Sequence, residues 1–224
     1  FTINKGETVA LVGVNGAGKS TIVKLLLRFY DATEGEILYN GKNIKEYDLN
    51  SLRNSYGAVF QDYKNFALSV FENVIGHDCD ENDKERARAA LKQSGIWEKI
   101  SALPDGGDTV ITKEFRKDGI GLSGGEKALI ALSIYFAIMR VNAPPFCFLD
   151  EVDTALDDIN VDRFADYMSK SDFATQFICI THRRGTMEAA DMLYGVTMQE
   201  KGITKLLELN ISELEKQLNL ENGR

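Results

Sequence analysis

The feature that most constrains the fold is the glycine-rich segment "GVNGAGKST", which runs from Gly13 to Thr21. It matches the pattern G-x-x-x-x-G-K-[ST], follows the apolar run "ETVALVG", and opens the helical pattern "GAGKSTIVKLLLRFY". Glycines let backbone N–H groups wrap around a phosphate, and the start of a helix adds its positive dipole. The segment predicts a phosphate-binding loop whose binding residues are Asn15, Gly16, Gly18, Lys19, Ser20 and Thr21.

Buried strands and helices alternate along the rest of the chain. Apolar runs predict strands at "YGAVFQD", "FCFLDE" and "QFICIT", and 3.6-residue patterns predict helices between and after them. The runs "MLYGVTM" and "ITKLLEL" predict a closing pair of strands. This alternation predicts an α/β fold with a mainly parallel sheet flanked by helices. We expect one domain over residues 1–224. Its nucleotide core is expected at about 1–65 and 144–210, its helical subdomain at about 66–143, and a C-terminal helix at about 211–222.

Polar residues follow three of the predicted strands directly. Nucleotide sites of open parallel sheets lie at the carboxyl ends of the strands, so these residues are expected to meet the phosphate loop. Lys19 would reach the terminal phosphates, while Ser20 and Asp150 would hold Mg²⁺. Glu151 would polarise the attacking water. His182 would contact the γ-phosphate, and Gln61 would complete the metal shell.

A second anion site is predicted at the helix start "GLSGGEKALIALSIYFAIM". Ser123 and Glu126 have the spacing of a capping box, yet Gly124 and Gly125 each cost about 1 kcal/mol in a helix interior. Bare backbone at a helix start leaves N–H groups open to a γ-phosphate. Because one chain already surrounds its nucleotide with its own loop, this second site indicates a nucleotide held between two chains.

The motifs "GVNGAGKST", "FQD", "LSGGE", "FLDE", "TALD" and "THR", in this order, resemble those of the ATP-binding cassette (ABC) ATPases. The resemblance implies a P-loop NTPase of the ABC-ATPase type with a helical subdomain, ATP and Mg²⁺ as ligands, and ATP hydrolysis. It also implies an ATP-dependent head-to-tail homodimer in which Ser123, Gly124 and Gly125 complete the site of the second copy. Asp157 would lie in the loop that crosses the dimer interface. His182 would be the switch histidine.

The two halves of the chain resemble different branches of this class. Residues 1 to about 121, with "SVFENV" and "TVITKEF", resemble the nucleotide-binding domain of a bacterial ABC exporter. Residues from about 122 to 209, with "PPFCFLDEVDTALDDINVDRF", resemble the C-terminal head segment of bacterial structural-maintenance-of-chromosomes (SMC) proteins. We expect an engineered chimera with its seam at about 121–127; the alternative is a divergent natural ATPase.

A folded scaffold that binds nucleotide weakly or not at all is the alternative function. Exporter-type domains begin with further strands that carry an aromatic residue stacked on adenine, and the sequence starts after that point with "FTINKGE". Base–aromatic stacking contributes roughly 1–3 kcal/mol. Without it, or with two imperfectly matched halves, the alternative predicts binding without turnover or no binding.

Charge and composition limit the partners. The net charge of −8 disfavours DNA binding through the general surface. No apolar run approaches the roughly 18 residues of a membrane span, and the start lacks the pattern of a signal peptide. The three cysteines have no metal-binding spacing. We expect a cytoplasmic protein without direct membrane insertion; the exporter resemblance implies that any membrane domain is a separate partner.

Overall fold

The computed structural model describes residues 1–60, 68–110, 124–141, 143–154, 156–170, 175–200 and 202–210. The chain forms two compact units. The first, here called the sheet unit, comprises Phe1–Gln61, Pro144–Thr154 and Val161–Arg224. The second, the helical unit, comprises Asp62–Ala143 and Ala155–Asn160.

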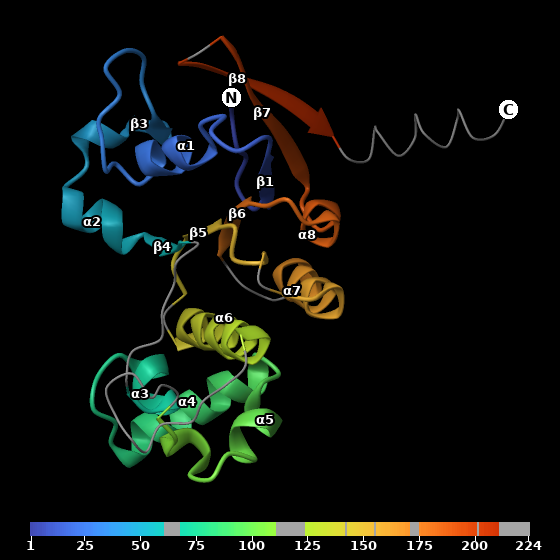
Figure 1. The fold of residues 1–224 in the computed structure, drawn as a ribbon. Helices are drawn as coiled ribbons and strands as arrows, with labels where there is room; N and C mark the ends of the chain where they lie inside the picture. The colour runs from blue at the N-terminus through green and yellow to red at the C-terminus, as the bar shows by residue number, and fades with distance from the viewer. Residues whose placement is uncertain are drawn as a thin grey trace, which may run out of the picture. The chain divides into compact units, whose positions relative to one another are not determined.

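The sheet unit contains a six-stranded sheet, counted over the described residues, in the order β4-β5-β6-β1-β7-β8 (Figure 1). Neighbouring strands from β4 to β7 are parallel, and β8 runs antiparallel to β7. This agrees with the mainly parallel sheet and terminal strand pair that the sequence predicts. The strands span Val9–Val12 (β1), Tyr56–Val59 (β4), Phe146–Asp150 (β5), Gln176–Ile180 (β6), Met192–Glu200 (β7) and Ile203–Asn210 (β8). A separate hairpin pairs Leu38–Tyr39 (β2) with Lys42–Asn43 (β3).

Helices flank this sheet (Figure 1). They span Lys19–Leu26 (α1), Ile44–Glu46 (the 3-10 helix η1), Leu49–Asn54 (α2), Asp158–Lys170 (α7) and Arg184–Glu188 (α8). The helical pattern after the phosphate loop continues to Tyr30, but α1 is shorter. Arg28 has a φ of 52°, and its guanidinium donates to the carbonyls of Ile44 and Tyr47, both at 3.1 Å. These bonds to a distant segment turn the chain away from the helix axis.

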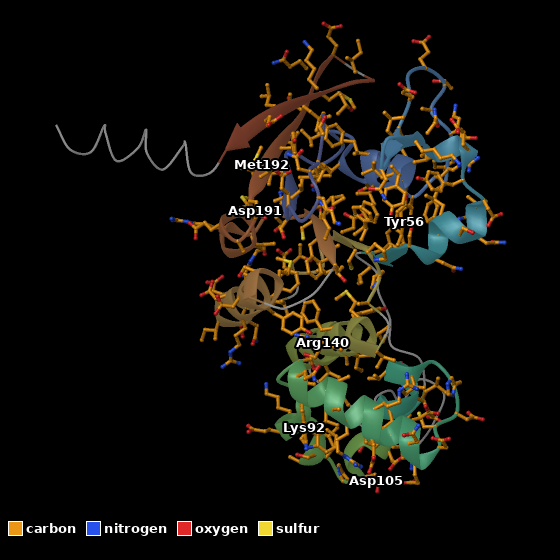
Figure 2. The ribbon with its side chains drawn as sticks, turned by 180° about the vertical axis from the view of Figure 1, so that it is seen from behind. Tyr56, Lys92, Asp105, Arg140, Asp191 and Met192 are labelled. Carbon is orange, nitrogen blue, oxygen red and sulfur yellow. The ribbon has the colours of Figure 1, made fainter. Side chains whose placement is uncertain are left out.

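The core of the sheet unit is formed by both halves of the sequence. Strands β1, β5, β6 and β7, helix α1 and the residues that flank this helix contribute the buried residues Val9, Leu11, Ala17, Val23, Leu27, Phe148, Ile178, Ile180, Tyr194 and Val196. The start of β7 is tied to the N-terminal segment near Asp191 and Met192, which Figure 2 labels. The Asp191 carboxylate accepts a hydrogen bond from Thr8 N–H at 2.7 Å, and Met192 N–H donates to Thr8 O at 3.2 Å.

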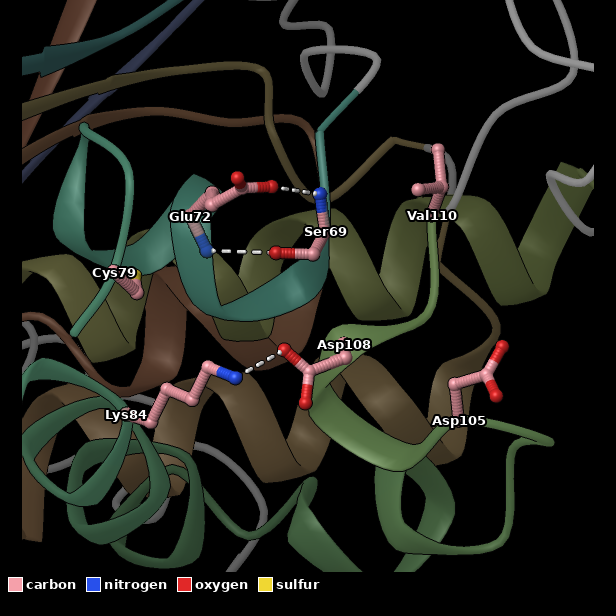
Figure 3. Close-up of a pocket in the computed structure, with 7 residues that line it drawn as sticks. All are labelled: Ser69, Glu72, Cys79, Lys84, Asp105, Asp108 and Val110. Carbon is pink, nitrogen blue, oxygen red and sulfur yellow. Dashed lines mark hydrogen bonds and ion pairs between the residues drawn. The ribbon is translucent and has the colours of Figure 1, made fainter. Parts of the chain in front are cut away.

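The helical unit packs α3 and α4 against α6 around an apolar core. Its helices span Val70–Ile75 (α3), Glu81–Gln93 (α4), Trp97–Ser101 (α5), Gly106–Asp108 (the 3-10 helix η2) and Gly124–Val141 (α6). Ser69 and Glu72 form a capping box at the start of α3, drawn in Figure 3. Lys84 of α4 pairs with Asp108 of η2 at 3.0 Å (Figure 3). Of the helices among the described residues, none combines the length and apolar character needed to cross a bilayer.

Substituting Gly107 with alanine should destabilise the helical unit. A Cβ atom at this position would lie 2.1 Å from the Phe71 ring. Phe71 is 2% exposed and stacks on Trp97, so the ring has little room to move. We expect a loss of about 1–3 kcal/mol of unfolding free energy. Trp97 is the sole tryptophan of the chain, so thermal unfolding followed by tryptophan fluorescence reports on this unit.

Gly195→Ala is the matched control, because its added Cβ would meet Leu207 at 3.6 Å, which is ordinary van der Waals contact. A Gly107→Ala protein that unfolds at the same temperature as the parent would contradict the packing described for Phe71.

Candidate functional site

Parallel register brings three strand ends to one edge of the sheet. Asp150 pairs with Ile180, and Ile180 pairs with Leu11. The segments that follow β1, β5 and β6 therefore leave the sheet side by side. They are the phosphate loop, the turn that begins at Glu151, and the loop that contains His182.

The ammonium group of Lys19 is buried within the phosphate loop. Lys19 is the first residue of α1 and is 5% exposed. Its Nζ donates to the carbonyls of Gly13 at 2.7 Å and Val14 at 3.2 Å. A buried cation is costly unless it is hydrogen-bonded or paired, and here the curled loop supplies the acceptors. The loop thus holds a positive charge at the N-terminus of a helix, where an anion is favoured.

Two loop glycines are required by close neighbours on the closing strands. A Cβ at Gly13 would lie 2.0 Å from the carbonyl oxygen of Val196 on β7. Gly18 has a φ of 102°, and a Cβ there would lie 2.5 Å from Thr204 Oγ1 on β8. The same Thr204 hydroxyl donates to Ala17 O at 2.9 Å. The hairpin of β7 and β8 therefore packs directly against the phosphate loop.

Asp150 lies at the end of β5, close to the start of α1. Burial raises the pKa of its carboxyl group, and the negative charge of Glu151 adds to this effect. A hydrogen bond with the Ser20 side chain and the charges of Lys19 and Lys24 oppose the rise in pKa. The half-buried carboxyl is thus in hydrogen-bonding contact with the hydroxyl that follows the loop lysine.

Glu151 and His182 face one another at the same edge. His182 Nε2 lies 3.2 Å from Glu151 Oε1, with 39% and 17% of the two side chains exposed. Glu151 has a φ of 52°, a left-handed conformation that costs a non-glycine residue of order 1–3 kcal/mol. Its N–H donates to Ile180 O at 2.9 Å, and its carbonyl accepts from the Thr154 hydroxyl at 2.8 Å. These bonds hold the backbone in the strained conformation.

A buried carboxylate, that of Asp153, follows Glu151 by two residues. Asp153 is 1% exposed, and its Oδ2 accepts hydrogen bonds from the hydroxyls of Thr181 and Thr186. Its Oδ1 has no hydrogen-bond partner among the described residues. An unsatisfied buried acceptor costs about 1–3 kcal/mol, and more when it is charged.

The other residues predicted for the site fall into three groups. Asn15, Gly16 and Thr21 are exposed on the phosphate loop and first turn of α1, and Gly16 has a φ of 80°. Gly124 and Gly125 are the first described residues of α6, in the helical unit. Asp157 also belongs to the helical unit; it lies in the loop before α7, and its carboxylate accepts a hydrogen bond from Asn160 N–H at 2.9 Å. Gln61 and Ser123 lie outside the described residues, as do residues 121–123 of the predicted seam and the predicted C-terminal helix at 211–222.

Sequence reasoning missed Thr204, Asp153 and its two threonine partners. The hydrogen bond from Thr204 joins residues 187 positions apart, and those to Asp153 span 28 and 33 positions. No local pattern marks such contacts. The one local signal was the carboxylate of Asp153 itself, two residues after Glu151 in the acidic segment "DEVD".

The residues present fit a magnesium-bound phosphate. No group of three or more His, Cys, Asp or Glu side chains able to hold a metal ion occurs in the described part of the chain. Mg²⁺ is usually bound by one or two carboxylates together with substrate phosphates and water, so such a group is not required. Ser20 and Asp150 provide a hydroxyl and a carboxylate next to the buried ammonium of Lys19.

Relatives come from two kinds of protein. Multidrug resistance protein 1 of Entamoeba histolytica is 37% identical over 196 residues, which is 87% of this chain and 14% of that protein. The chromosome partition protein Smc of Bacillus subtilis is 58% identical over 92 residues, or 41% of this chain and 8% of Smc. The chain therefore spans only a small part of the length of either relative.

One solved structure and one protein-family model agree with these relatives. A bacterial Atm1-family ABC exporter with ATP bound superposes with a TM-score of 0.76 and 31% sequence identity, over 97% of this chain and 36% of the exporter chain. The RecF/RecN/SMC N terminal domain family matches residues 23–205. These similarities support an ATP-binding NTPase function. The chain belongs to the RecF/RecN/SMC N terminal domain family, and its α/β fold is that of a P-loop ATPase domain of the ABC type.

Proposed function

We propose that the chain binds ATP with Mg²⁺ and hydrolyses it to ADP and phosphate. The observation that carries the proposal is the buried ammonium of Lys19, held on the carbonyls of the phosphate loop at the sheet edge where Asp150, Glu151 and His182 also lie. A positive helix start opposed by carboxylates suits a phosphate chain bridged by a divalent cation. ATP is proposed over other nucleotides on the similarity to ATP-binding relatives.

The residues of the phosphate loop bind the phosphates, and together with Asp150 and Gln61 they hold the metal ion in this proposal. Lys19 binds the terminal phosphates, exchanging its loop carbonyls for phosphate oxygens. Ser20 and Asp150 hold Mg²⁺, and Gln61 completes the metal shell. When bound, the ion would supply positive charge that stabilises the developing charge on the phosphate. The loop N–H groups contact phosphate, with ligand contacts assigned to Asn15, Gly16, Gly18 and Thr21.

Glu151 and His182 act on the water and on the terminal phosphate. The Glu151 carboxylate is 17% exposed, so it is reachable by a water molecule and able to accept its proton. We assign to the His182 ring, 3.2 Å from that carboxylate, the role of donating to a phosphate oxygen. The strained backbone of Glu151 fixes the direction from which its carboxylate approaches.

A second copy of the chain completes the site. The described part of α6 starts at Gly124, so two glycines without side chains lie at its N-terminal end. N–H groups in the first turn of a helix have no partner within the helix, which favours an anion there. We assign Ser123, Gly124 and Gly125 to the nucleotide of the partner copy, and Asp157 to the loop that crosses the interface. The exporter relatives add a possible membrane-domain partner, supplied by another chain or segment.

The pattern of similarity supports a chimera of exporter and SMC parts. Identity to Smc is high but confined to 92 residues, whereas identity to the multidrug resistance protein is lower and extends over 196 residues. A fusion near residues 121–127 accounts for both values. The fused halves share one core, since Val9, Leu11 and Val23 pack with Phe148 and Ile178. The alternative function, a scaffold without turnover, follows if this packing leaves the carboxylates misplaced.

Glu151→Gln should abolish turnover while leaving nucleotide binding intact. Glutamine keeps the shape of the side chain but cannot accept the proton of water, which costs about 10²–10⁴-fold in rate. Phosphate release and equilibrium binding of a fluorescent ATP analogue measure the two properties separately. Glu188→Gln is the control, because Glu188 is an exposed carboxylate paired with Arg184. Equal turnover in the Glu151→Gln and Glu188→Gln proteins would remove Glu151 from the catalytic role.

The Glu151→Gln protein should also form a dimer that depends on Mg-ATP. Blocked hydrolysis keeps ATP in place, and ATP contacts from both chains then stabilise the assembly. Light scattering at saturating Mg-ATP, compared with no nucleotide and with ADP, gives the mass. Adding Gly124→Trp to the same protein should prevent dimerisation, because the indole covers the start of α6. A mass that stays monomeric with Mg-ATP would overturn the proposed assembly.

A further inference from the structure

We propose that Asp153 is a positioning residue for Glu151 and His182. Its buried carboxylate joins the turn after β5 to the loop after β6 and to α8, and so sets the distance between the two side chains. This inference rests on the proposed function, which assigns hydrolysis to that pair.

The contacts of Asp153 connect three separate segments. Asp153 itself belongs to the turn after β5, Thr181 is the first residue after β6, and Thr186 lies in α8. Both hydroxyls donate to the same oxygen, Asp153 Oδ2. All three side chains are at most 1% exposed. Asp153, Thr181 and Thr186 therefore form a buried junction between the two segments that carry Glu151 and His182.

The sheet itself does not require this junction. Strands β5 and β6 are already joined by five residue pairs, from Phe146 with Gln176 to Asp150 with Ile180. Asp153 and Thr181 lie beyond the last pair of β5 and β6. The N–H of Thr181 still donates to Leu11 O on β1 at 3.3 Å, but that bond does not reach the turn after β5. Burying a carboxylate with one oxygen unpaired, counted within the described part of the chain, lowers the free energy of unfolding compared with an apolar side chain at the same place. Its position indicates a role in holding those two segments together.

The junction acts on both members of the pair through short lengths of backbone. Asp153 is two residues from Glu151, whose left-handed backbone is fixed by Ile180 O and Thr154. Thr181 directly precedes His182, and its Oγ1 also accepts from Arg183 N–H at 2.9 Å. The bonds of Thr181 thus hold the chain on both sides of the imidazole. If the junction loosens, the backbone bond from Glu151 N–H to Ile180 O remains, and the side chains of Glu151 and His182 are held less firmly at their 3.2 Å contact.

Thr186→Val tests the junction without touching the pair or the phosphate loop. Valine has the shape of threonine but donates no hydrogen bond to Asp153, whereas Thr186→Ser keeps the hydroxyl. We expect kcat for ATP to fall about ten- to hundredfold in Thr186→Val, because small misplacements of catalytic groups cost this much. KM for Mg-ATP should change by less than about threefold, since Lys19 and its loop are unaltered. Thr186→Ser should restore kcat.

A second measurement is independent of ATP turnover. The chain has two histidines, so ring-labelled His182 and His77 give two assignable NMR signals, with His77→Gln as the assignment control. In the parent, Glu151→Gln should displace the His182 signal, because the two side chains are in contact. In a Thr186→Val background the same substitution should displace it less. Thr186→Ala, which also donates no hydrogen bond to Asp153, replaces Thr186→Val if that variant does not fold.

The outcomes separate this inference from the proposed function. If the parent hydrolyses no ATP, the proposed function fails, while the displacement of the His182 signal still decides whether Asp153 positions the pair. A Thr186→Val protein with parental kcat, or with an unchanged response of His182 to Glu151→Gln, overturns the positioning role. A loss of thermal stability with parental kcat does the same, because it shows a purely structural junction.

Discussion

The buried ammonium of Lys19 is the constraint on which the rest of the site depends. A cation that is 5% exposed needs acceptors, and the phosphate loop supplies them only by curling so that the carbonyls of Gly13 and Val14 point inward. The same loop leads directly into the N-terminus of α1, where the helix dipole favours an anion. It also leaves no room for side chains where β7 and β8 approach the loop, which explains the glycines at 13 and 18.

The chemistry gathers at one sheet edge because the strands are parallel and in register. Asp150, Ile180 and Leu11 form one row across β5, β6 and β1, so each following residue enters the same region. Strand β1 precedes the proposed seam at about 121–127, whereas β5 and β6 follow it. The hydrogen bond from Thr204 to Ala17 likewise joins the two halves. The site is thus a product of their common fold and not of either half alone.

Local patterns predicted much of this structure, and long-range contacts account for what they missed. The glycine-rich loop, the strands and the polar residues at their ends each show in a few neighbouring letters. The end of α1 does not, because Arg28 is turned by carbonyls some 16 to 19 residues away. The Asp153 junction and Thr204 depend on tertiary contacts over larger separations. Sequence periodicity carries no information about such partners, which only the folded sheet brings together.

The central claim is that the buried charge of Lys19 exists to bind a nucleotide phosphate. Isothermal titration of the whole chain with Mg²⁺ and the slowly hydrolysed analogue ATPγS, compared with the Lys19→Met protein, tests it most directly. Methionine keeps the length and apolar stem of lysine but removes the ammonium. We expect saturable binding to the parent and an affinity lowered at least about tenfold in Lys19→Met, because one charge-assisted contact is lost. Equal affinities, or no binding to the parent, would contradict it.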